Sequence, residues 1–266
     1  MWHRIYRVAR SRKWLLAGES FGYLENGSST LVEALRCALQ SLPNFSLHLN
    51  TPAKKIVVSG GRVESVLCEK EQFPCDAVIS TIALQNLDQL LPRLADPYFE
   101  NIRSIQMIGV VCMLLNLDRP FSDNFWLNIN DPRIPHNGII ELTNLNQYYR
   151  QAGLNIVYIP YYLPVTASRY TASDDMLLQE NLATLKIINP SFDSSWIKEC
   201  VVSRSPHAQA ICTTGFSRRV PASRSPLQGL YVSDSTQFYP EDRTLSAAVR
   251  FGRKAAALCM EDLRGD

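Results

Sequence analysis

The C-terminal segment from Gly229 to Ala256 constrains the fold most, because a strand, a polar loop and a helix follow one another directly. Leu230–Val232 is a short apolar run that predicts a buried strand, and Asp234 follows at its end. Thr244 or Ser246 can then cap a helix. A carboxylate near a helix N-terminus, where free N–H groups attract negative charge, can hold a polyol and an electron-rich ring. Apolar residues at helical spacing predict one apolar helix face: Leu245, Ala248, Val249, Gly252 and Ala256.

This segment resembles the flavin-contacting C-terminal segment of a superfamily of FAD-dependent enzymes. The superfamily includes amine oxidases, protoporphyrinogen oxidases, phytoene desaturases and UDP-galactopyranose mutases. Tyr239-Pro-Glu-Asp-Arg243 is similar to an uncharacterised bacterial branch of FAD-dependent oxidoreductases. The resemblance implies that Asp234 holds the ribityl chain of FAD. It also implies that the backbone N–H groups of Leu245 and Ser246 face the pyrimidine edge of the flavin.

Three further positions belong to the implied cofactor site. Ser233 and Thr244 stand where the superfamily usually has glycine, so their side chains can crowd the approach of backbone to cofactor. Ala53 stands where a valine commonly touches the adenine end of FAD through its backbone, a contact that tolerates the change. The resemblance therefore implies FAD as the cofactor, contacted by Ala53, Ser233, Asp234, Thr244, Leu245 and Ser246.

The first third of the chain predicts elements in the order that the same superfamily uses. Residues 45–50 alternate as a strand, and β-branched runs on both sides of a Gly-Gly pair predict a hairpin over 54–67. Residues 73–82 predict a buried strand. A capped helix is expected over 31–42. Its buried face should contain Leu31, Ala34, Leu35, Ala38 and Leu39.

Several strands and one long helix are predicted in the middle of the chain, and this arrangement resembles the substrate-binding sheet of the superfamily. The predicted fold is therefore α+β or α/β, with an incomplete Rossmann-like FAD-binding domain and a substrate-binding domain that has a mixed or antiparallel sheet and helices. We expect a basic helical segment over 1–20, FAD-domain parts over 21–90 and 205–266, and a substrate-binding domain over 91–204. The strands are expected over 106–117, 125–129, 138–141 and 155–163, and the helix over 173–188.

The phosphate-binding motif of a dinucleotide fold is absent, since none of the twelve glycines forms G-x-G-x-x-G. Without that portion, the sheet that holds Val78–Ile79 and Tyr231–Val232 is expected to have an unpaired edge. We therefore expect the C-terminal portion of an FAD-dependent oxidoreductase, incomplete as a single chain. It would act on a small-molecule substrate, carbohydrate- or lipid-related, and a separate chain can carry the nucleotide-binding half. The alternative is a non-enzymatic degenerate paralogue or subunit that acts as an interaction module.

Composition argues against several other classes of protein. The net charge of +2 gives no reason to expect nucleic acid, and no apolar run is long enough to span a membrane. The seven cysteines are scattered without a C-x-x-C pair, which favours free thiols in the cytoplasm over disulfides or a zinc site. The first thirteen residues are basic, as in a targeting presequence or a solvated helix face.

No catalytic residue is identified from the sequence, and a hydrolase is not favoured because G-x-S-x-G is absent. His3 and His48 are expected to be solvated or packed. His136 lies in a loop where a site role and simple turn chemistry both remain open. His207 precedes the C-terminal strand, near Ala210, where the resembled branch has proline. Three strand tyrosines can line an apolar substrate cavity or pack in the core: Tyr158, Tyr161 and Tyr162.

Overall fold

The computed structural model describes residues 22–265, which form two compact units. Within this range, unit 1 comprises residues 48–106 and 209–265, and unit 2 comprises residues 22–47 and 107–208. The basic segment predicted over 1–20 and His3 lie outside the described residues.

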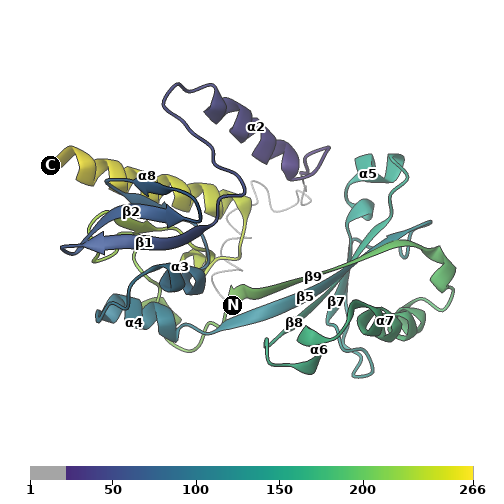
Figure 1. The fold of residues 1–266 in the computed structure, drawn as a ribbon. Helices are drawn as coiled ribbons and strands as arrows, with labels where there is room; N and C mark the ends of the chain where they lie inside the picture. Colours follow the sequence, from purple (N-terminus) through teal and green to yellow (C-terminus); the bar gives the residue numbers. More distant parts are fainter. Residues whose placement is uncertain (1–21, 266) are drawn as a thin grey trace, which may run out of the picture. The chain divides into compact units, whose positions relative to one another are not determined.

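Unit 1 contains two small sheets (Figure 1). The predicted hairpin is confirmed as β1 and β2 of an antiparallel sheet with the order β1-β2-β3, and Gly60 and Gly61 form its turn with positive φ. The second sheet is a parallel pair of β10 and β4. The single strand predicted over 73–82 is wrong, because β3 and β4 belong to different sheets. The bounds are β1 Ala53–Ser59, β2 Arg62–Cys68, β3 Gln72–Pro74, β4 Val78–Ser80 and β10 Leu230–Val232.

The parallel pair is short and open on one side. Gly229 starts it with φ +79°, and a Cβ there would lie 2.7 Å from the backbone oxygen of Asp76, so only glycine fits. The other edge of β10 is bridged by Arg224 opposite Tyr231. Among residues 22–265, β4 has no second neighbour, and Ile79 is 39% exposed. The expected open sheet edge is therefore at β4.

Helix α8 (Leu245–Gly265) packs on β10 and β4, and in the same unit α3 (Leu84–Leu90) and α4 (Pro97–Ser104) pack on each other. Thr244 caps α8, since its hydroxyl accepts the N–H of Ala247 at 3.1 Å. The predicted apolar face of α8 is not the buried one, and Leu245 is 58% exposed. The buried positions are smaller, because a helix that approaches a sheet closely has room only for short side chains: Ala247, Ala255 and Cys259.

Unit 2 is built on a five-stranded sheet with the order β6-β7-β8-β5-β9 (Figure 1). The four predicted strands are confirmed to within two residues. Strand β9 was not expected, because charged and polar residues interrupt its apolar pattern, as is usual for an edge strand. The bounds are β5 Met107–Leu117, β6 Trp126–Asn128, β7 Gly138–Glu141, β8 Ile156–Leu163 and β9 Ile197–Ala210.

The core of unit 2 lies between one face of this sheet and α7 (Asp174–Ile188), which confirms the predicted helix. Ser173 caps α7 by accepting the N–H of Met176 at 3.3 Å. Two short helices, α5 (Gln147–Gln151) and α6 (Ser168–Thr171), belong to the same unit. Alternate residues of β5 and β8 are fully buried against the helix, together with its inward side chains: Val111, Met113, Leu115, Leu117, Val157, Ile159, Leu177 and Leu185.

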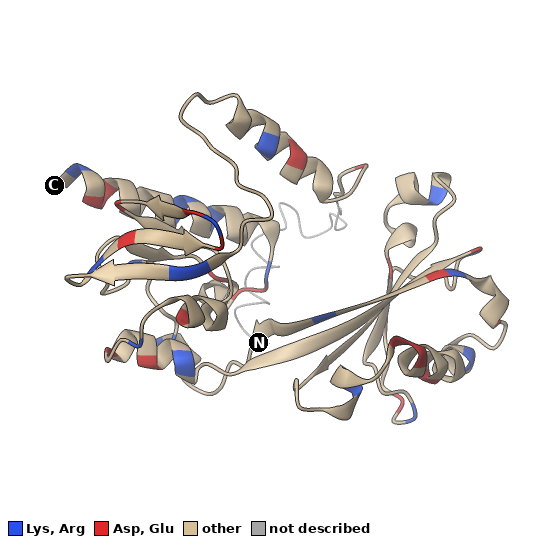
Figure 2. Cartoon of the chain, viewed as in Figure 1, with Lys and Arg blue, Asp and Glu red and all other residues tan. Residues whose placement is uncertain are grey.

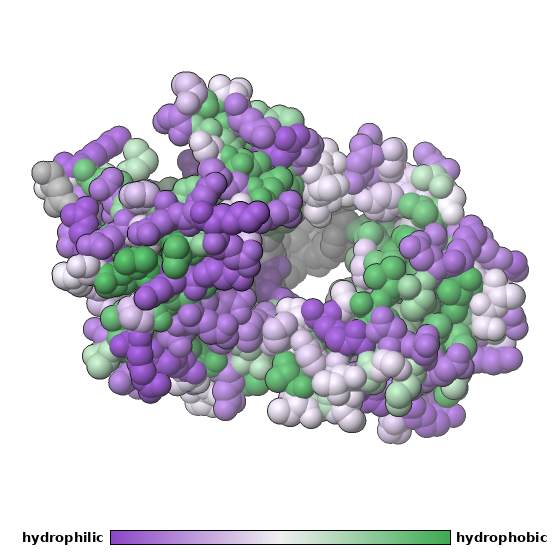
Figure 3. Space-filling view, viewed as in Figure 1, coloured by the Kyte–Doolittle hydropathy of each residue, from purple (hydrophilic) through white to green (hydrophobic). Residues whose placement is uncertain are grey.

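Helix α2 (Ser29–Gln40) is present close to its predicted place, but its predicted buried face is wrong. None of its residues is buried, and Val32 is 64% exposed, so apolar side chains appear on its surface (Figure 3). The correction covers Leu31, Ala34, Leu35, Ala38 and Leu39. The strand expected over 45–50 is also wrong, because no neighbouring strand pairs with it and its leucines are exposed.

Charged side chains of both signs are interspersed on each unit (Figure 2). All seven cysteines are unpaired. None of the helices between residues 22 and 265 has the length and apolar character needed to cross a membrane.

Candidate functional site

The candidate site of unit 1 is the carboxyl end of the two parallel strands. Strands β4 and β10 end side by side at Ser80 and Val232, and the N–H of Ser233 donates to the carbonyl of Ser80 at 2.8 Å. Ligands of open α/β sheets bind outside the carboxyl ends of the strands. This end of the sheet, here called the strand-end crevice, is where a ligand of unit 1 is expected.

Asp234 is held at the strand-end crevice by a local hydrogen-bond network. Its Oδ1 accepts the N–H of Thr236 at 2.8 Å, and its own N–H donates to Oε1 of Gln237 at 2.9 Å. These bonds cap the 3-10 helix η4 (Ser235–Phe238), and Gln237 Nε2 donates to the carbonyl of Pro221 at 3.1 Å. The carboxylate is therefore buried and oriented, with one oxygen engaged in the cap.

Two buried hydroxyl groups near this end of the sheet have no hydrogen-bond partner in the described structure. They are Ser80 Oγ and Thr236 Oγ1, on side chains that are 7% and 4% exposed. A buried polar atom without a partner costs about 1–3 kcal/mol, so native structures usually pair such atoms. These hydroxyls are consequently suited to the polar atoms of a bound ligand.

The start of α8 supplies backbone donors in the same unit. No residue between 22 and 265 accepts the N–H groups of Leu245 and Ser246. Free N–H groups in the first turn and the positive end of the helix dipole favour a partner with negative charge. The first turn can thus face an anionic or electron-rich group.

A pocket of about 240 Å³ adjoins η4. Ser235 and Thr236 line one side of it, and the loop before α8 lines another. In that loop Arg243 lies 3.5 Å from the Gln209 side chain. The pocket is lined by Gln209, Ala210, Cys212, Ser235, Thr236, Tyr239, Glu241, Asp242 and Arg243.

The structure brings some of the sequence-predicted contacts together. Ser233 and Asp234 lie at the strand-end crevice, and Thr244, Leu245 and Ser246 start the helix that packs on the same strands. Neither Ser233 nor Thr244 has a positive φ, so neither position requires glycine for its backbone conformation. Their assignment to FAD stays a prediction.

One predicted residue does not lie at this pocket, and two residues of the site were not predicted. Ala53 begins β1, is exposed and does not line the pocket beside η4. Ser80 and Thr236 were not singled out from the sequence. The available signal for Ser80 was a hydroxyl residue at the end of a buried parallel strand.

The tyrosines of β8 do not form one cluster. Tyr161 points into the core beneath α7, whereas Tyr158 and Tyr162 alternate onto the other side of the strand. His136 is buried in unit 2, and burial lowers its pKa. His48 packs on Phe73, with ring centroids 4.7 Å apart.

The sequence matches the protein family described as flavin containing amine oxidoreductase over residues 4–260. No curated protein matches it by sequence. Its fold is similar to a crystal structure of a proposed protoporphyrinogen oxidase from Exiguobacterium sp. 255-15, with a TM-score of 0.71, 17% identity, and coverage of 90% of this chain and 52% of that one. It is also similar to an oxidoreductase from Methanosarcina mazei, with a TM-score of 0.64, 17% identity, and coverage of 87% and 54%. The chain spans about half the length of both relatives.

Proposed function

This chain belongs to the flavin containing amine oxidoreductase family, and on that premise we propose that it forms the C-terminal part of an FAD-dependent oxidoreductase. In this proposal unit 1 contacts the flavin and unit 2 binds a small-molecule substrate. A nucleotide-binding portion with the G-x-G-x-x-G motif, which the 266 residues lack, holds the phosphates of FAD.

The observation that carries the proposal is the pair of unpartnered buried hydroxyls near the ends of β4 and β10. Ser80 and Thr236 leave their hydrogen-bonding capacity unused at the position where α/β sheets bind cofactors. Hydroxyl groups suit the ribityl chain of FAD, because each hydroxyl both donates and accepts a hydrogen bond. The residues present therefore fit the cofactor that the family implies.

Each residue of this site has a separate role in the proposal. Asp234 accepts from ribityl hydroxyls through the oxygen that the η4 cap leaves available. The free N–H groups of Leu245 and Ser246 stabilise negative charge at the pyrimidine edge of the flavin. When bound, FAD supplies hydride acceptance, and the protein orients the substrate and tunes the charge around the ring.

The open edge of β4 supports the need for a further segment. A parallel sheet is normally covered on both faces, and a sheet of two strands is marginal by itself. The N–H and carbonyl of Ile79 point away from β10, because those of Val78 and Ser80 face it. We propose that a strand of the nucleotide-binding portion pairs with this edge, and that this portion can be a separate chain.

The substrate is proposed to be a carbohydrate- or lipid-related small molecule held by unit 2. Support comes from the face of the sheet opposite α7, where Tyr158 and Cys112 are half-buried on neighbouring strands. Aromatic side chains there offer apolar area together with hydroxyl groups. The seven free thiols are compatible with a reducing compartment, which we propose is the cytoplasm.

Removal of the two hydroxyls tests the flavin site. Ser80→Ala and Thr236→Val should leave unfolding stability unchanged or slightly raised, because each lost hydroxyl has no partner in the protein. In protein purified from its source cells, each variant should raise the FAD dissociation constant by roughly tenfold. Thr184→Val is the control, since it breaks a hydrogen bond in unit 2 and should lower stability alone. Unchanged FAD affinity in both variants would remove the proposed site.

The alternative function is a non-enzymatic subunit that kept the fold and lost the cofactor. The observation in its favour is that Asp234 already satisfies a structural cap. The DNA upstream of the gene separates the two functions. An in-frame or overlapping G-x-G-x-x-G reading frame supports the enzyme, and unrelated sequence supports the interaction module.

A further inference from the structure

A second pocket, of about 340 Å³, lies in unit 2 where the loop over 129–137 faces the end of β8. Strand β7 pairs with β8 at Tyr158 and Val157, so the last residues of β8 face the loop. The volume lies within the usual range of about 300–1,000 Å³ for small-molecule sites. Its polar lining residues are Asn130, Asp131, His136, Asn137, Tyr161, Tyr162 and Arg169.

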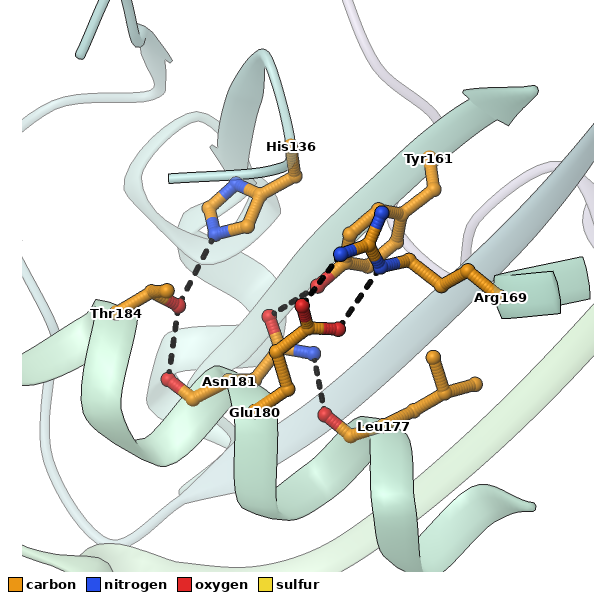
Figure 4. Close-up of polar contacts among 7 residues, drawn as sticks. All are labelled: His136, Tyr161, Arg169, Leu177, Glu180, Asn181 and Thr184. Carbon is orange, nitrogen blue, oxygen red and sulfur yellow. Dashed lines mark hydrogen bonds and ion pairs between the residues drawn. The ribbon is translucent and has the colours of Figure 1, made fainter. Parts of the chain in front are cut away.

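The inner wall of this loop pocket is held by a buried hydrogen-bond network (Figure 4). Nδ1 of His136 donates to the carbonyl of Gly138 at 3.3 Å, and Nε2 lies 3.4 Å from Oγ1 of Thr184. The hydroxyl of Thr184 also lies 3.0 Å from the carbonyl of Asn181. The network joins the loop to α7, so this wall is fixed before any ligand arrives.

Tyr161 and Arg169 extend the same wall (Figure 4). The hydroxyl of Tyr161 donates to Asn181 Oδ1 at 2.9 Å, and the guanidinium of Arg169 lies 5.6 Å from the centroid of the Tyr161 ring. Arg169 forms a bidentate pair with Glu180 through Nε and Nη2, at 2.8 and 2.5 Å. This pair fixes the planar guanidinium and leaves Nη1 available.

The mouth of the loop pocket carries side chains whose hydrogen-bonding groups are unused. Among the residues described, the side chains of Asn130 and Asn137, the hydroxyl of Tyr162 and Nη1 of Arg169 have no partner. The amides and the hydroxyl both donate and accept. Tyr162 lies on the other side of β8 from Tyr161 but also lines the pocket, and it is 45% exposed, so its ring offers an aromatic face. A matching ligand has donors, acceptors and a compact apolar surface.

The charges around the pocket cancel in pairs. Arg169 is neutralised by Glu180, and Asp131 is neutralised by the bidentate contact of Arg133, at 2.6 Å for the shortest N···O distance. Burial lowers the pKa of His136, which keeps its ring neutral at pH 7. The lining itself contains one carboxylate, Asp131, and one guanidinium, Arg169, and the partner that neutralises each of them lies outside the lining. The site therefore favours an uncharged ligand.

We propose that the loop pocket binds a neutral, hydroxyl-rich ring of the size of a monosaccharide. The amides of Asn130 and Asn137 and the free edge of Arg169 pair with its hydroxyls. The ring of Tyr162 packs on its C–H face. This binding needs no flavin, so its test is independent of the proposed oxidoreductase function.

The test is a saturation-transfer NMR titration of the 266-residue chain with D-glucose and with myo-inositol. We expect saturable binding of at least one probe with a dissociation constant on the order of 1 mM. Tyr162→Ala should weaken binding by roughly tenfold, and Tyr162→Phe by less, because it keeps the aromatic face. Both variants should fold, since Tyr162 is exposed. Tyr148→Ala is the matched control, because Tyr148 is exposed on α5 and does not line the pocket.

Each outcome of the titration decides the proposal. Saturable binding that falls in Tyr162→Ala and persists in Tyr148→Ala supports it. Absence of saturable binding to both probes overturns it, as does an equal loss in the two alanine variants. Tighter binding of glucuronate or glucosamine than of the neutral probes overturns the assignment of an uncharged ligand.

Discussion

Substitution of Asp234 separates its structural role from the proposed cofactor contact. Asp234→Asn keeps an oxygen that can accept the N–H of Thr236, now 2.8 Å from Oδ1, so stability should change little. Asp234→Ala removes the cap and should cost about 1 kcal/mol. A hydrogen bond to a charged group contributes about 1.5–3 kcal/mol, so loss of the ribityl contact should raise the FAD dissociation constant roughly 10- to 150-fold.

The assay pairs urea unfolding with a flavin fluorescence titration of protein purified from its source cells. Asp234→Asn should weaken FAD binding about tenfold while its unfolding curve stays close to that of the wild type. Asp193→Asn is the matched control, because Asp193 caps a 3-10 helix in unit 2 in the same way. FAD affinity that is unchanged in Asp234→Asn, or reduced equally in Asp193→Asn, would refute the reasoning.

Three further predictions concern folding and are read by urea unfolding. Gly229→Ala should destabilise unit 1 by more than about 2 kcal/mol, because a Cβ would lie 2.7 Å from a backbone oxygen. Gly153 has a similar φ but open space around it, so Gly153→Ala should cost only about 1 kcal/mol. Equal losses would contradict this. Glu141→Ala leaves the buried N–H of Phe121 and the partly buried N–H and hydroxyl of Ser122 without their acceptor, and should cost about 2–5 kcal/mol. Glu141→Gln should cost less. Burial lowers the pKa of His136 in the folded state below 6.5. As the pH drops, the imidazole is therefore protonated in the unfolded chain before it is protonated in the folded one. The free energy of unfolding should fall below about pH 6.5, by at most about 1.4 kcal/mol per pH unit. His136→Gln should remove that part of the slope.

Local sequence patterns predicted most helices and strands, because the local pattern of each one agrees with the way it packs on its neighbours. The hairpin, β10, α7 and the strands around the unit 2 core have periodic apolar residues, turn glycines or caps that agree with their packing. Leu230–Val232 was predicted with its observed bounds, since an apolar run between Gly229 and a polar loop has few other conformations.

Periodicity could not show which apolar face is buried. Helix α2 has a clear apolar stripe, but no described element covers Val32 or Leu35. Helix α8 buries Ala247 and Ala255, which a hydrophobicity pattern ranks below Leu245. Both outcomes depend on tertiary neighbours that a single helix does not encode.

The candidate site was predictable only where it follows one stretch of chain. Asp234 and the start of α8 lie close in sequence to β10, so the resemblance placed them together. Ser80 and Thr236 are far apart in sequence, and their shared lack of a partner appears only in three dimensions. The loop pocket likewise joins a β6–β7 loop to α6 and β8, which no local motif links.

The most direct test of the central claim is the visible absorption spectrum of the protein purified from its source cells under native conditions. The account predicts the two flavin absorption bands, a released cofactor with the mass of FAD, and weaker bands in Asp234→Ala. A folded, colourless protein from the same cells would contradict the claim that this chain completes a flavin site.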